Sequence, residues 1–383
     1  MNQNSLDSIL GSPETSQSAS EVIVTAQRIL PSENGALVLL LQTDVMTGRS
    51  SNALVRLRAD GSYSVTVDLT AAPDALEREV IDVMTGADGL GLMVGAKGVW
   101  CTGKKAQPVV DAVNALGLTG ISRIVSGNDA TVVLSEGALH LVHSKGTAVE
   151  IALPPLALGG WRHLGQILID GQTLYVAVSD PVSGFDVFHA DLDAPKPGFE
   201  PLLTRGAQRF ALNAAVPAMC RTDRGILFGT AALAGPAQPV GDWGPELLLL
   251  TQGGEWDLIA GQPRFSPSGL RLPASSLMPG LGQPGNAAVM AITHHEGQTF
   301  VALQNFAGDS VEDRREVAPD LFNYHGPVRL YHSSDLETWD QMEHHLPDTL
   351  GPISAMSVTT HMVILGHEGL GDRAIPVVFA PRT

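Results

Sequence analysis

The 383-residue sequence contains few lysines, few aromatic side chains and only two cysteines. Acidic residues outnumber basic ones by 40 to 23, which gives a formal net charge of −17 at pH 7. Binding of nucleic acid needs a cluster of cations that faces the phosphates, and no such stripe occurs here. The cysteines, Cys101 and Cys220, are far apart and form no Cys-x-x-Cys pattern, so we expect neither a disulfide framework nor a structural zinc site.

Long apolar runs are also missing. No run approaches the roughly 20 residues that a membrane-spanning helix requires. The first residues lack the basic segment followed by an apolar segment that is typical of a secretory signal. We therefore predict no membrane insertion and a cytoplasmic location, with export in a particle left open.

Glycine and proline are abundant, at 41 and 25 residues, as expected for many short strands separated by turns. Two stretches share one pattern, Asn213–Met219 (NAAVPAM) and Asn286–Ile292 (NAAVMAI). Each is followed by a turn, an apolar run, an insertion, another strand and a tryptophan, Trp256 or Trp339. A repeated unit that cannot bury both of its faces alone predicts an array of such units. We interpret this array as a β-propeller.

The spacing of the apolar runs predicts an all-β, single-domain fold for residues 21–383, a seven-bladed β-propeller of four-stranded antiparallel blades. Blade two is expected over Val80 to about Val113, and six blades remain the alternative if this blade does not form. Residues 1–20 are expected to be a flexible tail. The last blade lacks a fourth strand, so Leu6–Leu10 is a candidate for a docking or ring-closing strand.

The segment Ser333-Ser-Asp-Leu-Glu-Thr-Trp339 resembles the Asp-box turn of sialidase-type propellers and similar turns of glycoside-hydrolase propellers. It departs from the Asp-box pattern because Glu337 replaces the usual glycine and the spacing is one residue shorter. The resemblance implies a propeller in which Ser333 and Asp335 cap a tight hairpin turn and Trp339 packs between blades. It implies no catalytic role for the turn.

Three long insertions, residues 233–244, 261–285 and 307–325, belong to the predicted blades five and six. Loops that join blades and loops between second and third strands meet on one face of a propeller, where binding sites are commonly built. The candidate ligand-binding residues on this face are Arg162, His163, Asn213, Asp242, Trp243, Arg264, Asn286, Asp320, Tyr324 and His325. Such a mixture suits a polar small ligand or a peptide. The alternative is that the asparagines cap strand starts and the charged residues pair within their loops.

Other chemistries find less support in the sequence. Among twelve histidines only His163 falls on a predicted inner strand, so we predict no metal site and no cofactor. No Gly-x-Ser-x-Gly elbow marks a serine nucleophile. A carboxylate pair for glycoside hydrolysis could come from Asp242, Glu316 and Asp320, but the sequence does not fix their separation.

Two hypotheses for function follow. The first is a binding or assembly module that recognises a protein or a carbohydrate through the loops of blades five and six. The alternative is a hydrolase or lyase that acts on a small polar substrate at the mouth of the channel, with no catalytic residue assigned. Catalysis requires a convergent, partly buried set of groups with displaced pKa values, whereas binding requires only an exposed face with anchoring side chains.

Overall fold

The computed structural model describes most of the chain, with gaps. The described residues are 22–32, 35–44, 50–57, 63–68, 80–83, 92–95, 98–101, 107–127, 130–136, 138–143, 147–154, 163–232, 244–283, 285–305, 328–344, 350–358, 362–368 and 374–379. The predicted tail, including Leu6–Leu10, lies outside these residues.

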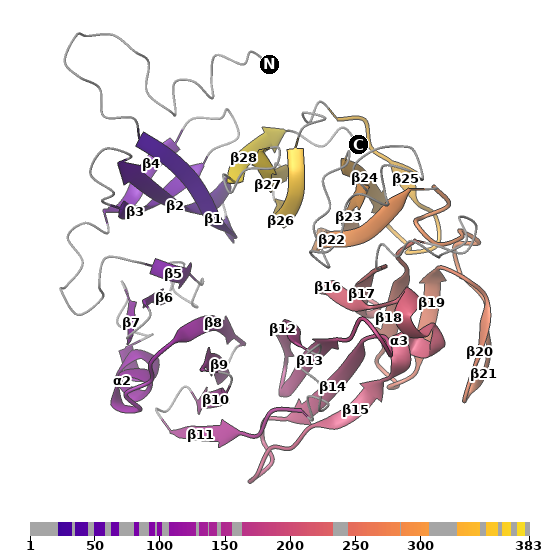
Figure 1. The fold of residues 1–383 in the computed structure, drawn as a ribbon, viewed down its shortest axis with the longest axis horizontal. Coiled ribbons are helices and arrows are strands. Elements are labelled where there is room, and N and C mark those ends of the chain that lie inside the picture. The colour runs from indigo at the N-terminus through magenta and orange to yellow at the C-terminus, as the bar shows by residue number, and fades with distance from the viewer. Residues whose placement is uncertain are drawn as a thin grey trace. The chain divides into compact units, whose positions relative to one another are not determined.

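The chain divides into two compact units. Figure 1 labels their helices and strands. The first comprises Met1–Ile151, Ser357–Leu365 and Gly371–Pro381, and the second comprises Ala152–Met356, Gly366–Leu370 and Arg382–Thr383. The prediction of a mostly-β fold with antiparallel sheets is confirmed.

Three sheets form from residues 22–151, and in each of them the chain order of the strands is also their order in the sheet. The first sheet contains β1 (Val22–Ser32), β2 (Gly35–Asp44), β3 (Ser50–Leu57) and β4 (Tyr63–Asp68). The second contains β5 (Val80–Val83), β6 (Leu92–Gly95) and β7 (Gly98–Cys101). The third contains β8 (Ile121–Ser126), β9 (Ala130–Ser135), β10 (Ala138–His143) and β11 (Ala148–Ile151).

One element of the first unit differs from the prediction. The sequence predicts strand structure up to about Val113, but Gln107–Ala115 is the helix α2. Its Val110 and Val113 are three residues apart, lie on one face of the helix, and pack with Ile121 and Val142 in a buried cluster. The spacing of these two valines is helical, and it was hidden by the short length of the segment.

The second unit contains two larger sheets. The first is four-stranded, with β12 (His163–Asp170), β13 (Thr173–Ser179), β14 (Asp186–Asp191) and β15 (Glu200–Leu203). The second is eight-stranded and contains β16 (Ala215–Thr222), β17 (Gly225–Ala231), β18 (Leu247–Thr251), β19 (Trp256–Ala260), β22 (Asn286–His295), β23 (Gln298–Asn305), β24 (Val328–Ser333) and β25 (Asp340–Gln341). A single pairing of β17 with β22, at Ala231 and Ala288, joins its two four-stranded halves.

Two small sheets complete the fold. One is the hairpin of β20 (Arg264–Ser266) and β21 (Gly269–Arg271). The other is three-stranded, with β26 (Leu350–Val358), β27 (Met362–Glu368) and β28 (Ala374–Phe379) in that order. Among the described residues, no fourth strand pairs with this last sheet. Leu6–Leu10, the segment predicted to close it, lies outside the described residues.

The strands β17 and β18 are buried on both faces. On one side, Leu227 and Leu249 pack in a cluster with Val289 and Val301 of the neighbouring half-sheet. On the other side, Phe228 and its neighbours pack against residues of β13–β15 in a second cluster. Burial on both faces explains the unbroken run of leucines over residues 247–250, because neither side of β18 meets water.

The turn that resembles an Asp-box, residues 333–339, has the predicted caps. The Asp335 carboxylate accepts bonds from the backbone N–H groups of Thr338 at 2.7 Å and Glu337 at 2.8 Å. These bonds lower the pKa of Asp335 to about 2. The ionised form is therefore favoured in the folded turn, and this contribution is present above pH of about 4 and lost as the pH falls through about 2.

Gly229 of β17 lies where the two half-sheets meet, and a methyl group at this position would come within 2.3 Å of Val289 Cγ1. We expect Gly229→Ala to lower the free energy of unfolding by about 1–3 kcal/mol, because it overpacks a closed core. Gly253→Ala is the matched control, since the nearest atom to its added methyl would be 3.9 Å away. Urea unfolding of both variants tests this, and equal stabilities would contradict the packing described.

Candidate functional site

One end of the eight-stranded sheet gathers the ends of two long insertions. Ala231, which precedes the insertion at 233–243, pairs with Ala215 at the start of β16. Asn305, which precedes the insertion at 306–327, pairs with Asn286 at the start of β22. Since β17 also meets β22 at this end, Ala231 and Asn305, the strand residues before the two insertions, lie at the same end of the sheet.

Two asparagines at this end hold the chain in the same way. The Asn213 amide donates to the Gly206 carbonyl at 3.1 Å, and the Asn286 amide donates to the Gly280 carbonyl at 2.8 Å. Both asparagines are fully buried. Their side-chain oxygens accept bonds from arginines, Arg209 at 3.2 Å and Arg329 at 3.3 Å. The sequence repeat NAAV thus marks a repeated arrangement, in which a buried asparagine bonds to the carbonyl of a preceding glycine and to an arginine.

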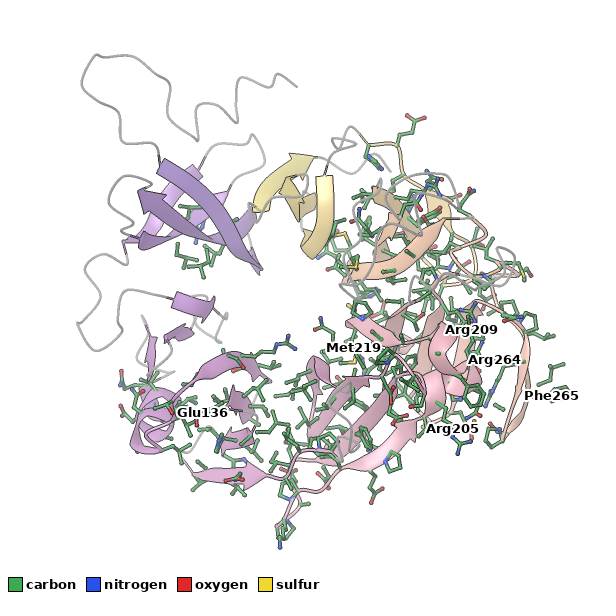
Figure 2. The ribbon with its side chains drawn as sticks, viewed as in Figure 1. Glu136, Arg205, Arg209, Met219, Arg264 and Phe265 are labelled. Atoms are coloured by element: carbon green, nitrogen blue, oxygen red, sulfur yellow. The ribbon has the colours of Figure 1, made fainter. Side chains whose placement is uncertain are left out.

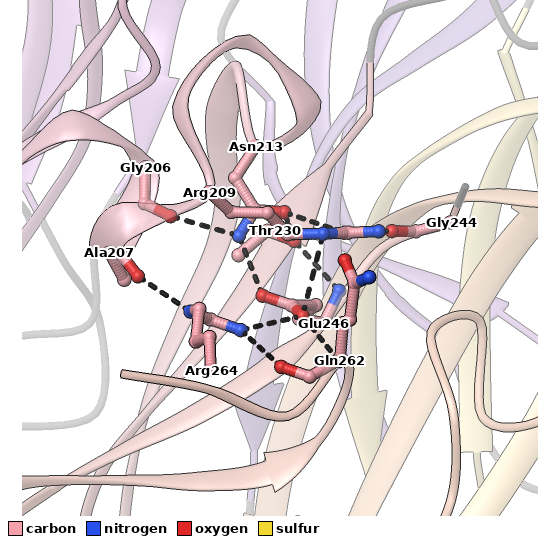
Figure 3. Close-up of polar contacts among 9 residues, drawn as sticks. All are labelled: Gly206, Ala207, Arg209, Asn213, Thr230, Gly244, Glu246, Gln262 and Arg264. Carbon is pink, nitrogen blue, oxygen red and sulfur yellow. Dashed lines mark hydrogen bonds and ion pairs between the residues drawn. The ribbon is translucent and has the colours of Figure 1, made fainter. Parts of the chain in front are cut away.

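A buried carboxylate lies between two arginines beneath this end (Figure 3). Arg264 Nη1 is 2.9 Å from Glu246 Oε1, and Arg209 Nε is 3.6 Å from the same oxygen. The side chains of Glu246, Arg209 and Arg264 are 0%, 2% and 10% exposed. The second oxygen, Glu246 Oε2, accepts a bond from Asn213 at 2.7 Å. We call Arg209, Asn213, Glu246 and Arg264 the buried polar cluster.

Backbone groups complete the bonds of the cluster. Glu246 Oε1 accepts the Gln262 N–H at 2.8 Å, and the Gly244 carbonyl accepts a bond from Arg209 Nη1 at 2.6 Å. The Thr230 hydroxyl joins the Glu246 backbone N–H, at 2.7 Å, to the Asn213 side-chain oxygen, at 3.1 Å (Figure 3). The cluster therefore bonds to Thr230 and Gly244, near the two ends of the insertion predicted at 233–244, and through Glu246 to Gln262 in the segment that follows β19.

The backbone beside the cluster is strained. Arg205, Gly206, Ala207 and Gln208 have φ of 55°, 59°, 52° and 68°, so the short element α3 (Arg205–Gln208) is a left-handed turn. Left-handed backbone costs roughly 1–2 kcal/mol for each L-residue. Arg264 Nε donates to the Ala207 carbonyl at 2.7 Å, which with the Asn213 bond to Gly206 holds the turn in place. Strain of this kind is found where surrounding structure fixes a functional surface.

The predicted insertion 261–285 is more ordered than a loop. It contains the hairpin β20–β21, and residues 274 and 275 run beside β19, with their N–H groups bonded to Leu258 and Ile259. Farther on, Gly280 N–H donates to the Pro245 carbonyl at 2.7 Å, and Leu281 is buried in the core. The segment thus covers the chain that leads into β18.

The structure brings together only part of the predicted site. Asn213 and Arg264 both bind Glu246, whereas Asn286 contacts Arg329 in the adjoining half-sheet. His163 begins β12 opposite Ser179, next to Asp180, whose N–H bonds the Ala214 carbonyl, so its backbone lies at the same end. The predicted residues outside the described ranges are Arg162, Asp242, Trp243, Asp320, Tyr324 and His325.

Sequence reasoning missed Arg209 and Glu246, although they are central to the cluster. A signal was present for one of them, because Glu246 immediately precedes four leucines of a strand that is buried on both faces. A charged residue there is expected to have a buried partner. Arg209 follows a segment without regular periodicity and gives no such signal.

Titratable groups in the described residues show no catalytic pair at this end. Burial raises the pKa of Tyr331, an effect that the Asn286 side chain and the Arg329 charge partly offset. The described segments contain no group of three or more His, Cys, Asp or Glu side chains placed to hold a metal ion. They also contain no helix with the length and apolar character needed to cross a membrane.

Comparison with known proteins gives structural relatives only. No protein-family model matches the sequence, and no curated protein matches it. Acylaminoacyl peptidase of Pyrococcus horikoshii aligns with 94% of this chain and 51% of its own, at a TM-score of 0.54 and 10% identity. The β-propeller domain of the Trilobed protease from Pyrococcus furiosus aligns over 93% of this chain and 95% of that domain, at a TM-score of 0.50 and 9% identity.

The chain has the fold of a β-propeller domain. The predicted fold class is therefore confirmed at this level. This chain spans about half the length of the peptidase it resembles and nearly the whole of the isolated propeller domain. At about 10% identity, the likeness is one of fold alone.

The buried polar cluster predicts a large effect for a change that removes only one charge. Glu246→Gln keeps the shape of the side chain but leaves two buried arginines without their shared carboxylate. We expect this variant to lower the free energy of unfolding by about 3–5 kcal/mol, because an uncompensated buried charge is costly. The measurement is urea unfolding of the purified proteins.

The control for that experiment is Glu255→Gln. Glu255 also binds an arginine, Arg271, at 2.7 Å, but its side chain is 65% exposed. Its loss should cost less than about 1 kcal/mol. Two variants of equal stability would show that the buried carboxylate does not hold the structure.

Proposed function

We propose that this protein is a binding module, a seven-bladed propeller of four-stranded blades that recognises a protein or a carbohydrate. The proposed recognition surface is formed by the two insertions predicted at residues 233–244 and 307–325. The observation that carries the proposal is the buried polar cluster, which bonds to Thr230 and Gly244 near the two ends of the first insertion. Loops held by a rigid scaffold are the usual location of binding residues.

The strained turn supports the same proposal. A left-handed stretch at Arg205–Gln208 is costly, yet it is retained and held by side chains of the cluster. Pre-organisation of this kind reduces the ordering cost when a ligand binds.

The proposed residues divide into two groups by their environment. Asn213 and Asn286 are fully buried and bond to the backbone, so we assign them to support of the surface. Arg264 links this support to the surface. The residues that we propose contact the ligand are Arg162, His163, Asp242, Trp243, Asp320, Tyr324 and His325.

The alternative is a hydrolase or lyase acting on a small polar substrate at the same end. Its support is the likeness to a peptidase, which at 10% identity is a likeness of fold. The described residues add no pair of groups with displaced pKa values at this end, and Tyr331 there is a buried hydroxyl whose pKa is raised. We therefore rank binding first.

We expect Trp243→Ala combined with His325→Ala to leave the melting temperature within about 2 °C, because we propose that both side chains contact the ligand and take no part in the core. The native protein is first tested on a glycan array and a peptide array to find what it binds. The double variant should bind those glycans or peptides at least tenfold more weakly, since aromatic anchors dominate such surfaces. Arg224→Ala, at the turn between β16 and β17 at the other end of the sheet, is the control. Loss of folding in the double variant, or unchanged binding, would contradict the proposal.

A further inference from the structure

The hairpin β20–β21 presents its polar face to the protein and its apolar face to solvent. In its register Arg264 lies opposite Arg271, and Phe265 lies opposite Leu270. The two arginines face inward, and the exposed fractions of Phe265, Leu270 and Leu272 are 77%, 54% and 62%. Figure 2 shows Phe265 projecting away from the strands. A half-buried hairpin normally has the reverse arrangement.

The inward face is firmly attached. Both guanidinium groups lie over the Trp256 ring, with Cζ at 5.3 Å for Arg264 and 5.2 Å for Arg271. Arg264 also binds Glu246, and Arg271 binds Glu255 at 2.7 Å. Like charges directly opposite on a hairpin repel, so this arrangement requires the ring and the carboxylates. The hairpin is therefore held in one orientation, with its apolar face outward.

The outward face carries no charge. Between residues 265 and 285 Arg271 is the one charged residue, and it points inward to Glu255 and Trp256. The whole chain has a net charge of −17. Two copies of such an acidic protein repel one another over most of their surfaces. A face without acidic side chains is where they can approach, and an apolar face fits its own copy.

We propose that this face, Phe265, Leu270 and Leu272, is a contact between two copies of the chain. A two-fold arrangement places the Phe265–Leu270 pair of one copy against the same pair of the other, as a closed symmetric dimer requires. The contact is separate from the ligand surface proposed above and does not depend on it. Because a hairpin is small compared with a standard interface, we expect a dissociation constant on the order of 10 µM.

The test is sedimentation velocity of the full chain from about 1 to 200 µM, at about 50 and 500 mM NaCl. We expect a monomer–dimer equilibrium that tightens with salt, since salt screens the repulsion between two acidic copies and leaves apolar contact intact. Phe265→Ser combined with Leu270→Ser should weaken dimerisation at least tenfold, with Phe265→Ala as the milder variant if the double variant does not fold. The control is Val182→Ser, because Val182 is 73% exposed at another position in the same unit.

Hydrogen exchange at high and low protein concentration gives a second readout, with protection by dimerisation expected over residues 264–272. The inference is overturned if the native chain stays monomeric throughout, including at high salt. It is also overturned if a dimer forms that the hairpin variants leave intact. Neither result bears on the glycan and peptide arrays, so this inference and the proposed function fail independently.

Discussion

The carboxylate of Glu246 is the interaction on which this end of the molecule depends. It is fully buried and is bonded by groups from two separate segments, Asn213 before β16 and Gln262 and Arg264 after β19. Glu246 itself leads into β18, so the carboxylate joins three segments in all. A buried charge is tolerated only when its lone pairs are satisfied and opposite charge lies close by. Each bond therefore constrains the position of a segment that would otherwise be free to move.

This constraint connects sheet packing to the proposed recognition surface. The strands β17 and β18 are fixed by apolar packing on both faces, but such packing fixes the strands and leaves their connections undetermined. The buried polar cluster, together with the bonds from Asn213 to Gly206 and from Asn286 to Gly280, fixes the positions of those connections relative to the sheet. The left-handed turn at Arg205–Gln208 illustrates the result, because its cost is offset by bonds to Arg264 and Asn213.

The two half-sheets use the same device with different chemistry. Asn213 bonds the glutamate that precedes β18, whereas Asn286 bonds Arg329 at the equivalent place in β24. In both, an asparagine amide holds a glycine carbonyl upstream, at Gly206 or Gly280, where φ is +59° or +72°. The repeat in the sequence is thus maintained by a local structural requirement, and the divergent partner residues leave the surfaces above free to differ.

The sequence predicted strands better than it predicted the site. Apolar runs such as Leu247–Leu250 and the repeat at Asn213 and Asn286 lie in or beside the strands that the structure contains, since period and burial are local signals. The prediction of strand structure up to about Val113 was wrong, because the helix Gln107–Ala115 has only nine residues, too few for the helical period of its apolar positions to show. The pairing of Glu246 with Arg209 and Arg264 depends on which segments meet in space, and a single sequence carries no such information.

The central claim is that the buried polar cluster holds the connections at this end, including the left-handed turn. Hydrogen exchange of the backbone amides at residues 205–210 in native protein and in Arg264→Ala tests it most directly. The account predicts that exchange in this turn accelerates at least tenfold while the amides of β17 keep their protection, because the sheet is held by apolar packing. Unchanged exchange at 205–210, or an equal rise throughout the sheet, would contradict it.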